Sequence, residues 1–195
     1  MNDRQPKAVR QGYKPAPFFF HQSNERGDVR IAAWAPSLGT MQSLFERLIG
    51  LLPPSIEVLV KVKAEEDQFP GDDPPSWCRF HGVVARDALL EAIARCPVFV
   101  FEDSRNQLCL RDPRSFDYIV LDDVGVVYVY SEQPPFRHVL AEFGFEERVE
   151  PLVNDEWFWC QTPKAGPDQE RDFIRLLRLE PVPAPGEGRD RRVIH

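Results

Sequence analysis

The amino-acid sequence predicts an α+β protein in which a mixed, mostly antiparallel sheet is covered by three to four helices. Three observations lead to this fold class. Apolar residues recur at helical spacing in several segments, other segments alternate apolar and polar residues, and Pro and Gly mark the boundaries between them. The chain has 195 residues, of which 43% are hydrophobic, and this is enough for one sizeable core. We therefore expect a single compact domain.

The two ends of the chain differ in composition from the part between them. Residues 1–17 are basic and contain three prolines, and residues 181–195 are rich in Pro, Gly and charged side chains. Neither end holds enough apolar residues to offset the entropy that ordering would cost. We predict a disordered basic arm over 1–17, a globular domain over 18–180 and a disordered Pro-rich tail over 181–195.

The first part of the domain is predicted to form a strand, a helix and a second strand. Residues 29–35 are apolar, Ser37 is placed to cap a helix, and apolar side chains then recur at helical spacing up to Ile49. Gly50 and the prolines after it end this helix. Residues 56–63 alternate between apolar and mostly polar side chains, which predicts a strand with one buried face and one wet face.

The next segments are predicted to form a loop, a helix and two strands. Residues 64–77 are acidic and contain three prolines and a glycine, so we expect a long loop. A helix is predicted over 84–95, where an apolar stripe ends before Pro97. Residues 98–101 are continuously apolar and are predicted as a strand, and 107–110 form a short strand candidate.

The last part of the domain begins with a predicted hairpin. Residues 116–121 and 126–130 flank a turn in which Gly125 is available for a positive φ. Pro134 opens a third helix, which ends at Gly144. The remaining candidates are an edge strand within 145–153, a strand over 156–161 and a last helix over 167–178.

The charge of the chain is unevenly distributed. There are 31 Asp and Glu against 24 Lys and Arg, a formal net charge of −7. Residues 1–14 carry +3 and residues 187–195 carry +1, which leaves −11 for residues 15–186. An acidic body repels phosphate backbones, so nucleic acid is an unfavourable ligand. The same charge attracts a basic protein surface and speeds encounter with it.

Composition and motifs also exclude several classes of protein. No stretch approaches the roughly 20 apolar residues of a membrane helix, and no signal-peptide core is visible. The four cysteines form no C-x-x-C pair and suit reduced, buried thiols, so we expect a cytoplasmic protein without membrane association. The motifs of phosphate-binding loops, serine hydrolases, zinc proteases and EF-hands are absent, and no cofactor is predicted.

The main candidate for a binding surface is the acidic loop. Its carboxylates would steer encounter with a basic partner, and its aromatic side chains would serve as apolar anchors. A solvated loop is the alternative, since runs of charge commonly form a solvated surface. The predicted partner-binding residues are Glu65, Glu66, Asp67, Phe69, Asp72, Asp73 and Trp77.

Two other groups of residues have the composition of a metal site. Asp103, Asp122 and Asp123 follow strand candidates and are suitable ligands for Mg²⁺ in phosphoester chemistry, although Asp at these positions also stabilises turns. Cys78 and His81 have the spacing of two zinc ligands, but the sequence holds no second such pair. No metal site and no catalytic residue is therefore assigned.

From these features we predict a non-enzymatic, acidic protein-binding domain with a basic protein as its partner. In charge and size it is comparable to the immunity proteins that neutralise bacterial toxins, an analogy that involves no shared motif. Two alternatives stay open. One is a metal-assisted hydrolase that acts on a phosphoester through the strand-end carboxylates, and the other is a structural or regulatory subunit of a larger complex.

Overall fold

The protein combines one large sheet, a short two-stranded ribbon and helices. The computed structural model describes residues 8–10, 17–23, 29–35, 37–63, 77–115, 117–123, 125–131, 133–147, 157–159 and 167–183. Within these residues the strands are β1 (Ala8–Arg10), β2 (Phe18–Ser23), β3 (Val29–Trp34), β4 (Ser55–Lys63), β5 (Trp77–Ala85), β6 (Asn106–Arg111), β7 (Tyr118–Leu121), β8 (Val127–Tyr130), β9 (Glu146–Glu147), β10 (Trp157–Trp159) and β11 (Glu180–Pro181). The helices are α1 (Leu38–Ile49), α2 (Arg86–Arg95), α3 (Pro97–Glu102), α4 (Pro134–Glu142) and α5 (Pro167–Leu177).

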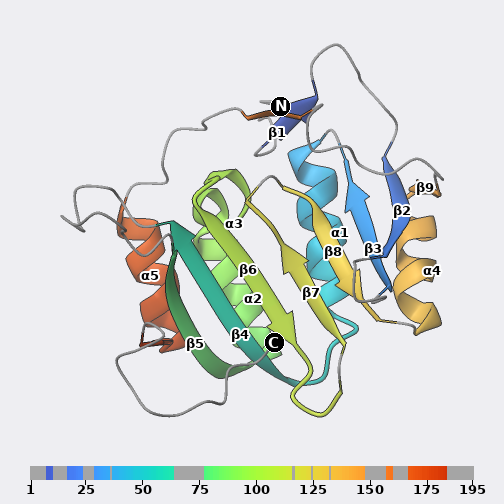
Figure 1. Ribbon diagram of the computed structural model, residues 1–195. Coiled ribbons are helices and arrows are strands. Elements are labelled where there is room, and N and C mark those ends of the chain that lie inside the picture. The colour runs from blue at the N-terminus through green and yellow to red at the C-terminus, as the bar shows by residue number, and fades with distance from the viewer. Residues whose placement is uncertain are drawn as a thin grey trace.

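The large sheet has the strand order β11-β5-β4-β6-β7-β8-β3-β2-β9. Neighbouring strands run antiparallel except β2 and β9, which run parallel. The sheet is therefore mixed and mostly antiparallel, and the predicted α+β class is confirmed. Figure 1 shows its central strands β4, β6 and β7 in front of α1, α2 and α3. The ribbon of β1 and β10 is a separate antiparallel pair.

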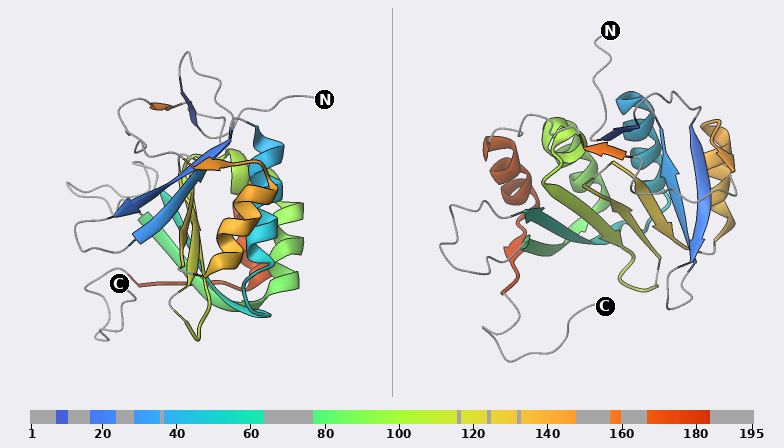
Figure 2. Two further views of the ribbon diagram at one scale, coloured as in Figure 1. Left: turned by 90° about the vertical axis from the view of Figure 1, so that its right-hand side faces the viewer. Right: turned by 45° about the horizontal axis from the view of Figure 1, so that its top comes forward.

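One face of the large sheet forms the core. In β4, Val58 and Val60 are at most 1% exposed, and they lie directly opposite Leu110 and Leu108 of β6, which are also buried. The residues between them point to the other face, because successive side chains of a strand alternate. Figure 2 (left) shows the helices stacked on the buried side of the sheet. The sequence pattern of alternating residues in β4 thus identified the core face correctly.

Helix α1 begins and ends where the sequence predicts. The side-chain oxygen of Ser37 accepts a hydrogen bond from the backbone N–H of Thr40 at 3.5 Å, as expected for a helix cap. The backbone N–H of Gly50 donates to the carbonyl of Glu46 at 3.1 Å and closes the last turn. The apolar stripe of α1 packs on the sheet and beside α4. Its buried residues are Met41, Leu44, Phe45, Leu48 and Ile49.

The prediction of a strand over 98–101 is wrong, because these residues belong to α3. This adds a fifth helix within the described residues, where three to four were expected. Pro97 starts the helix, at a position where its missing N–H is not needed. Phe99, Val100 and Phe101 are all at most 3% exposed. Three consecutive residues of a helix point in different directions, and here all three are buried. The apolar run therefore has no period that would distinguish a helix from a strand.

Strand β5 occupies residues that were predicted as the end of a loop and the start of a helix. Val84 lies in this strand, and α2 begins only at Arg86. The strand pairs with β4 along its whole length, up to Lys63 opposite Trp77. Most of its side chains are only half-buried, so its apolar alternation is weak. The long partner strand β4, rather than local pattern, decides its conformation.

The predicted ends of the domain coincide with short strands. The arm predicted over 1–17 includes β1, and the tail predicted over 181–195 begins within β11. The edge strand predicted within 145–153 is represented by β9, which pairs with β2 at one margin of the sheet. The strand predicted over 156–161 contains β10, which pairs with β1 instead of joining the large sheet. The division of the chain into arm, domain and tail stays a prediction.

Candidate functional site

Among the described residues no helix lies on the face of the large sheet opposite α1 to α5, and we call this side the open face (Figure 2). Its β3 end is buried, since Ala32 and Trp34 are at most 2% exposed. Residues that pair directly on neighbouring strands lie on the same face, so the register shows which side chains meet there. The residues of β3 to β8 on the open face are Arg30, Ala32, Trp34, Ser55, Glu57, Leu59, Lys61, Lys63, Trp77, Arg79, His81, Val83, Ala85, Gln107, Cys109, Arg111, Tyr118, Val120, Tyr128 and Tyr130.

A mostly apolar row crosses the middle of the open face. Its members lie opposite one another on successive strands from β8 to β5, in the order Tyr128, Val120, Cys109, Leu59 and His81. All of them are half-buried. Burial raises the pKa of the Cys109 thiol above its usual range, so this cysteine behaves as a small apolar side chain. The row gives the open face an apolar centre.

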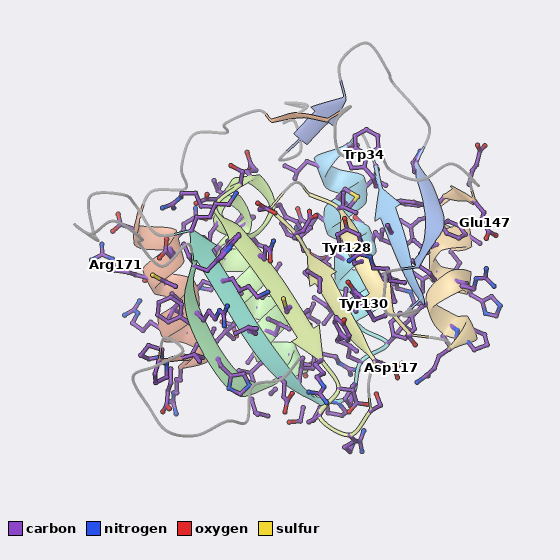
Figure 3. The ribbon with its side chains drawn as sticks, viewed as in Figure 1. Trp34, Asp117, Tyr128, Tyr130, Glu147 and Arg171 are labelled. Carbon is purple, nitrogen blue, oxygen red and sulfur yellow. The ribbon has the colours of Figure 1, made fainter. Side chains whose placement is uncertain are left out.

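Arg30 joins three tyrosines into one cluster on the open face. Its Nη1 donates to the Tyr130 hydroxyl at 2.5 Å, and its guanidinium carbon lies 4.2 Å from the centroid of the Tyr128 ring. The rings of Tyr118 and Tyr130 stack with centroids 3.9 Å apart and an angle of 11° between their planes. Burial raises the pKa of the Tyr128 phenol well above its usual range, and the nearby charge of Asp122 adds to this. Figure 3 shows Tyr128 and Tyr130 along β8.

Positive charge predominates on the open face. Lys61 and Arg79 lie directly opposite each other on β4 and β5, and neither side chain has a hydrogen bond or ion pair among the described residues. Arg111 lies 3.8 Å from Glu57, measured between Nη1 and Oε2. With β11 included, the strand residues here comprise the basic side chains Arg30, Lys61, Lys63, Arg79 and Arg111 and the carboxylates Glu57 and Glu180.

Of the predicted partner-binding residues, only Trp77 is described. It is the first residue of β5 and is half-buried, with the Lys63 ammonium 5.4 Å from its ring centroid. These two residues form the last pair of the β4–β5 hairpin, so the segment 64–76 joins them. The residues outside the described part of the chain are Glu65, Glu66, Asp67, Phe69, Asp72 and Asp73.

The described residues are close to electrical neutrality. They hold 17 Asp and Glu and 15 Lys and Arg, whereas the segment 64–76 alone holds five carboxylates and no Lys or Arg. Many of the described carboxylates pair with arginines. Asp112 lies 3.6 Å from Arg114, and Glu147 lies 3.3 Å from Arg137. The excess negative charge of the chain is therefore concentrated outside the described residues, with its largest share in 64–76.

The strand-end carboxylates that suggested a hydrolase have separate partners. Asp103 forms an ion pair with Arg105, and Asp122 accepts a hydrogen bond from the backbone N–H of Val126 at 2.8 Å. The Oδ2 atom of Asp123 lies 2.6 Å from the ammonium of Lys63 on β4. In the part of the chain that the structure describes, no group of three or more His, Cys, Asp or Glu side chains could hold a metal ion. The backbone contacts of Asp103 and Asp122 match the turn role that the sequence left open as the alternative, and the ion pairs of Asp103 and Asp123 add to it.

Cys78 and His81 both lie on β5, three positions apart, so they point to opposite faces of the sheet. Cys78 lies opposite the buried Val62, whereas His81 lies opposite Leu59 on the open face. The pair therefore does not have the geometry of two ligands of one zinc ion. The Nε2 atom of His81 is buried and has no hydrogen-bond partner among the described residues.

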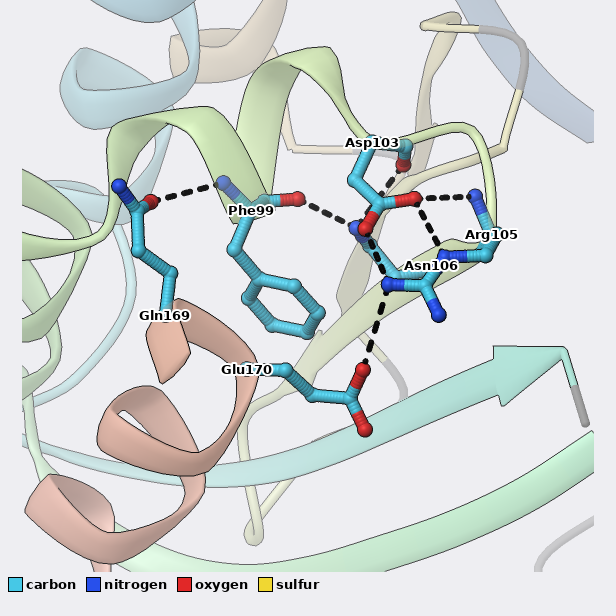
Figure 4. A network of polar contacts seen from close by, with 6 residues as sticks. All are labelled: Phe99, Asp103, Arg105, Asn106, Gln169 and Glu170. Atoms are coloured by element: carbon cyan, nitrogen blue, oxygen red, sulfur yellow. Dashed lines mark hydrogen bonds and ion pairs between the residues drawn. The ribbon is translucent and has the colours of Figure 1, made fainter. Parts of the chain in front are cut away.

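A buried polar network holds α5 against the sheet (Figure 4). Asp103 and Asn106 are each 1% exposed. The Nη2 atom of Arg105 lies 2.7 Å from Asp103 and 3.4 Å from Glu170 of α5. The side-chain amide of Asn106 donates to the carbonyl oxygens of Asp103, at 2.9 Å, and of Phe99. The network links α3, β6 and α5, and we assign it a structural role.

A shallow pocket of about 170 Å³ lies where the α1–β4 turn, the β6–β7 turn and the start of α4 meet. Its two carboxylates are already engaged within these turns. Asp112 accepts from the backbone N–H of Arg114 at 2.8 Å. Asp117 accepts from the Ser115 hydroxyl at 2.9 Å and from the Gln133 amide at 2.5 Å. The two carboxylates of the pocket therefore stabilise the surrounding turns, and we assign them no binding role.

Sequence reasoning did not identify the open face as a candidate surface. A weak signal was present in 77–85, where the polar side chains Arg79 and His81 stand two positions apart among mostly apolar residues. This spacing is typical of a strand with one accessible face. No local signal indicates the cluster around Arg30, because Tyr118 and Tyr130 reach it only through the sheet register.

Comparison of the chain with protein-family models, curated proteins and solved structures finds no significant match. Among the described residues, no helix is both long enough and apolar enough to span a membrane. Any functional assignment therefore depends on the residues and their geometry.

Proposed function

We propose that the protein is a non-enzymatic binding domain that docks on a basic protein through the segment 64–76 and Trp77. The observation that carries this proposal is the distribution of charge. The described residues are nearly neutral, and the segment 64–76 holds five carboxylates without a Lys or Arg. A local excess of one charge attracts a surface of the opposite charge and raises the rate of association.

The position of the segment supports the same proposal. Lys63 and Trp77 are paired at the end of the β4–β5 hairpin, which ties both ends of 64–76 to a rigid strand pair. Trp77 is half-buried at this point, as expected for an aromatic side chain that supplies contact area beside a charged surface. Charge would then steer the encounter, and the indole ring would add affinity.

The partner class follows by analogy with small acidic proteins that neutralise a basic toxin, as bacterial immunity proteins do. A cytoplasmic location belongs to this proposal, and the free thiols of Cys78, Cys96 and Cys109 are compatible with a reducing compartment. The metal-assisted hydrolase and the regulatory subunit remain alternatives without a specific supporting observation.

The test begins with capture of the partner from the native host. The rate of association between the partner and the protein is then measured at low and moderate salt. In the test variant Glu65, Glu66, Asp67, Asp72 and Asp73 are replaced by their amides. We expect a decrease of about tenfold in the association rate at low salt and a flatter salt dependence. The matched control neutralises five exposed carboxylates elsewhere, namely Asp87, Glu91, Glu142, Glu146 and Glu147.

Equal association rates for the wild type and the loop variant would remove 64–76 from the interface. A similar decrease in the control variant would show that total charge, and not the segment, governs association. A Trp77→Ala variant should bind with unchanged association rate and about tenfold faster dissociation, because a central aromatic contact acts mainly on dissociation.

A further inference from the structure

Two like charges face each other on the open face without compensation. Lys61 of β4 and Arg79 of β5 are directly opposite residues, and such pairs have Cβ atoms roughly 5 Å apart. Like charges at this position destabilise a sheet. Neither side chain has a hydrogen bond or ion pair among the described residues. The arrangement costs stability.

The carboxylates nearest to this pair are engaged by other residues or lie in a neighbouring row: Asp123 contacts Lys63 and the Gln107 amide, and Glu180 of β11 lies opposite His81. On β6, the residue opposite Lys61 is the neutral Gln107. The next row of the open face contains Leu59 and His81, and the His81 Nε2 atom is buried without a hydrogen-bond partner among the described residues. Two cations without a hydrogen bond or ion pair among the described residues therefore lie beside an apolar row and an unsatisfied polar atom.

We propose that the open face receives an extended, acidic segment of a partner polypeptide, whose carboxylates pair with Lys61 and Arg79. Basic residues outnumber carboxylates among the strand residues of this face, which gives it the charge complementary to such a segment. In an extended segment alternate side chains point the same way, so acidic and apolar residues can meet the cationic row and the apolar row respectively. The proposal uses residues other than those of 64–76 and does not depend on that segment.

A polypeptide fits this face better than a single-stranded nucleic acid. Bases bind to sheets by stacking on free aromatic faces. The tyrosines here are already engaged, because Tyr118 stacks on Tyr130 and the guanidinium of Arg30 lies over Tyr128.

The proposal predicts that one substitution has opposite effects on stability and on binding. Lys61→Glu replaces a repulsive cross-strand pair by an attractive one with Arg79, so it should raise the melting temperature. The same substitution removes a cation from the binding surface, so it should weaken binding of an acidic peptide. A residue with a merely structural role would not lose binding while it gains stability.

The experiment uses the full chain and two probes, poly-L-glutamate and a synthetic peptide of the repeat Glu-Ser-Val-Ser, in which Glu and Val alternate on one side of the extended chain. Binding is followed by amide chemical shifts in NMR spectra and by calorimetry at low salt. We expect shifts along β4, β5 and β6, and a loss of affinity of about tenfold for Lys61→Glu and for Arg79→Glu. The control Arg95→Glu makes the same charge change on α2, on the side of the sheet that the helices cover, and should retain binding.

Three outcomes would overturn the inference. They are wild-type affinity of Lys61→Glu for both peptides, a lower melting temperature of Lys61→Glu together with lost binding, and tighter binding of single-stranded DNA than of either peptide. The last outcome would assign the face to nucleic acid. The variant with a neutralised segment 64–76 separates the two proposals, because it should bind the acidic peptides at least as well as the wild type.

Discussion

The Nη2 atom of Arg105 lies 2.7 Å from Oδ2 of Asp103, a carboxylate that is only 1% exposed. The backbone N–H and the Nε atom of Arg105 also donate to Oδ1 of Asp103, at 2.9 and 3.1 Å. Both oxygens of a deeply buried carboxylate are thus occupied by one neighbouring residue. A buried charge is tolerated only with such compensation, so this pair fixes the passage from α3 to β6.

Replacement of Arg105 by Ala should destabilise the protein by about 3 kcal/mol, because it leaves the buried Asp103 carboxylate without its cation. The measurement is the free energy of unfolding from urea denaturation monitored by circular dichroism. Glu170→Gln is the control, since Glu170 is 23% exposed and lies farther from the arginine, at 3.4 Å. Its effect should stay below about 1 kcal/mol. Equal effects of the two substitutions would contradict the assignment of Asp103 as the central group.

Replacement of Asn106 by Asp should cost at least about 2 kcal/mol, although the two side chains have the same shape. The Asn106 amide donates to the carbonyl oxygens of Phe99 and Asp103 at a position that is 1% exposed. A carboxylate cannot donate, so both carbonyls lose their donor and a second buried charge is added near Asp103. The midpoint of urea unfolding checks this expectation, and an unchanged midpoint at pH 7 would refute it.

A methyl group at Gly82 should destabilise the contact between β5 and the end of α5. A Cβ atom at Gly82 would lie 2.9 Å from a methyl carbon of Leu179, so the leucine must move. We expect Gly82→Ala to cost about 1 kcal/mol. In the double variant with Leu179→Ala, the added cost of the Gly82 substitution should be smaller, because the clashing atoms are gone.

The control for this substitution is Gly39→Ala on the exposed side of α1. Its nearest neighbour would be the Ser37 hydroxyl oxygen at 3.8 Å, which is ordinary contact. Ala is the better helix former, so Gly39→Ala should raise the free energy of unfolding by about 0.5–1 kcal/mol. Thermal unfolding of the two variants side by side tests both signs, and stabilisation by Gly82→Ala would disprove the close approach of Leu179.

Tyr128 should make stability fall at alkaline pH. Its pKa in the folded protein is raised above the usual value of 10.0, chiefly by burial, so the folded state favours the neutral phenol. The stabilisation is complete below pH 10 and decreases as the pH rises above that value, because the unfolded chain then loses its proton more readily. Unfolding free energies across this range, compared with those of Tyr128→Phe, provide the test.

The Tyr128→Phe variant cannot ionise at this position, so its stability should decrease less steeply above pH 10 than that of the wild type. Absorbance at alkaline pH offers an independent measurement, since one tyrosine of the folded wild type should titrate later than the usual phenol, and this late titration should be absent from the variant. Identical pH profiles for the two proteins would show that the ring environment of Tyr128 is more accessible than its contacts with Arg30 indicate.

Local sequence patterns predicted most elements of the fold. The cap at Ser37, the alternation in β4 and the prolines in the first turn of α4 act within a few residues, so α1, β4 and α4 lie where the sequence places them. The errors concern α3 and β5. The apolar run at 98–101 is buried on several sides and carries no period, and β5 depends on its pairing with β4.

The candidate sites also differ in how far the sequence alone could predict them. Charge composition is a property of the sequence, and it was sufficient to single out the carboxylates of 64–76 as the main local excess of negative charge. The pairing of Lys61 with Arg79 and the cluster around Arg30 could not be read from the sequence, because they join residues of different strands. Only the register of the folded sheet determines which side chains become neighbours, since hydrogen bonding between strands acts across large separations in the chain.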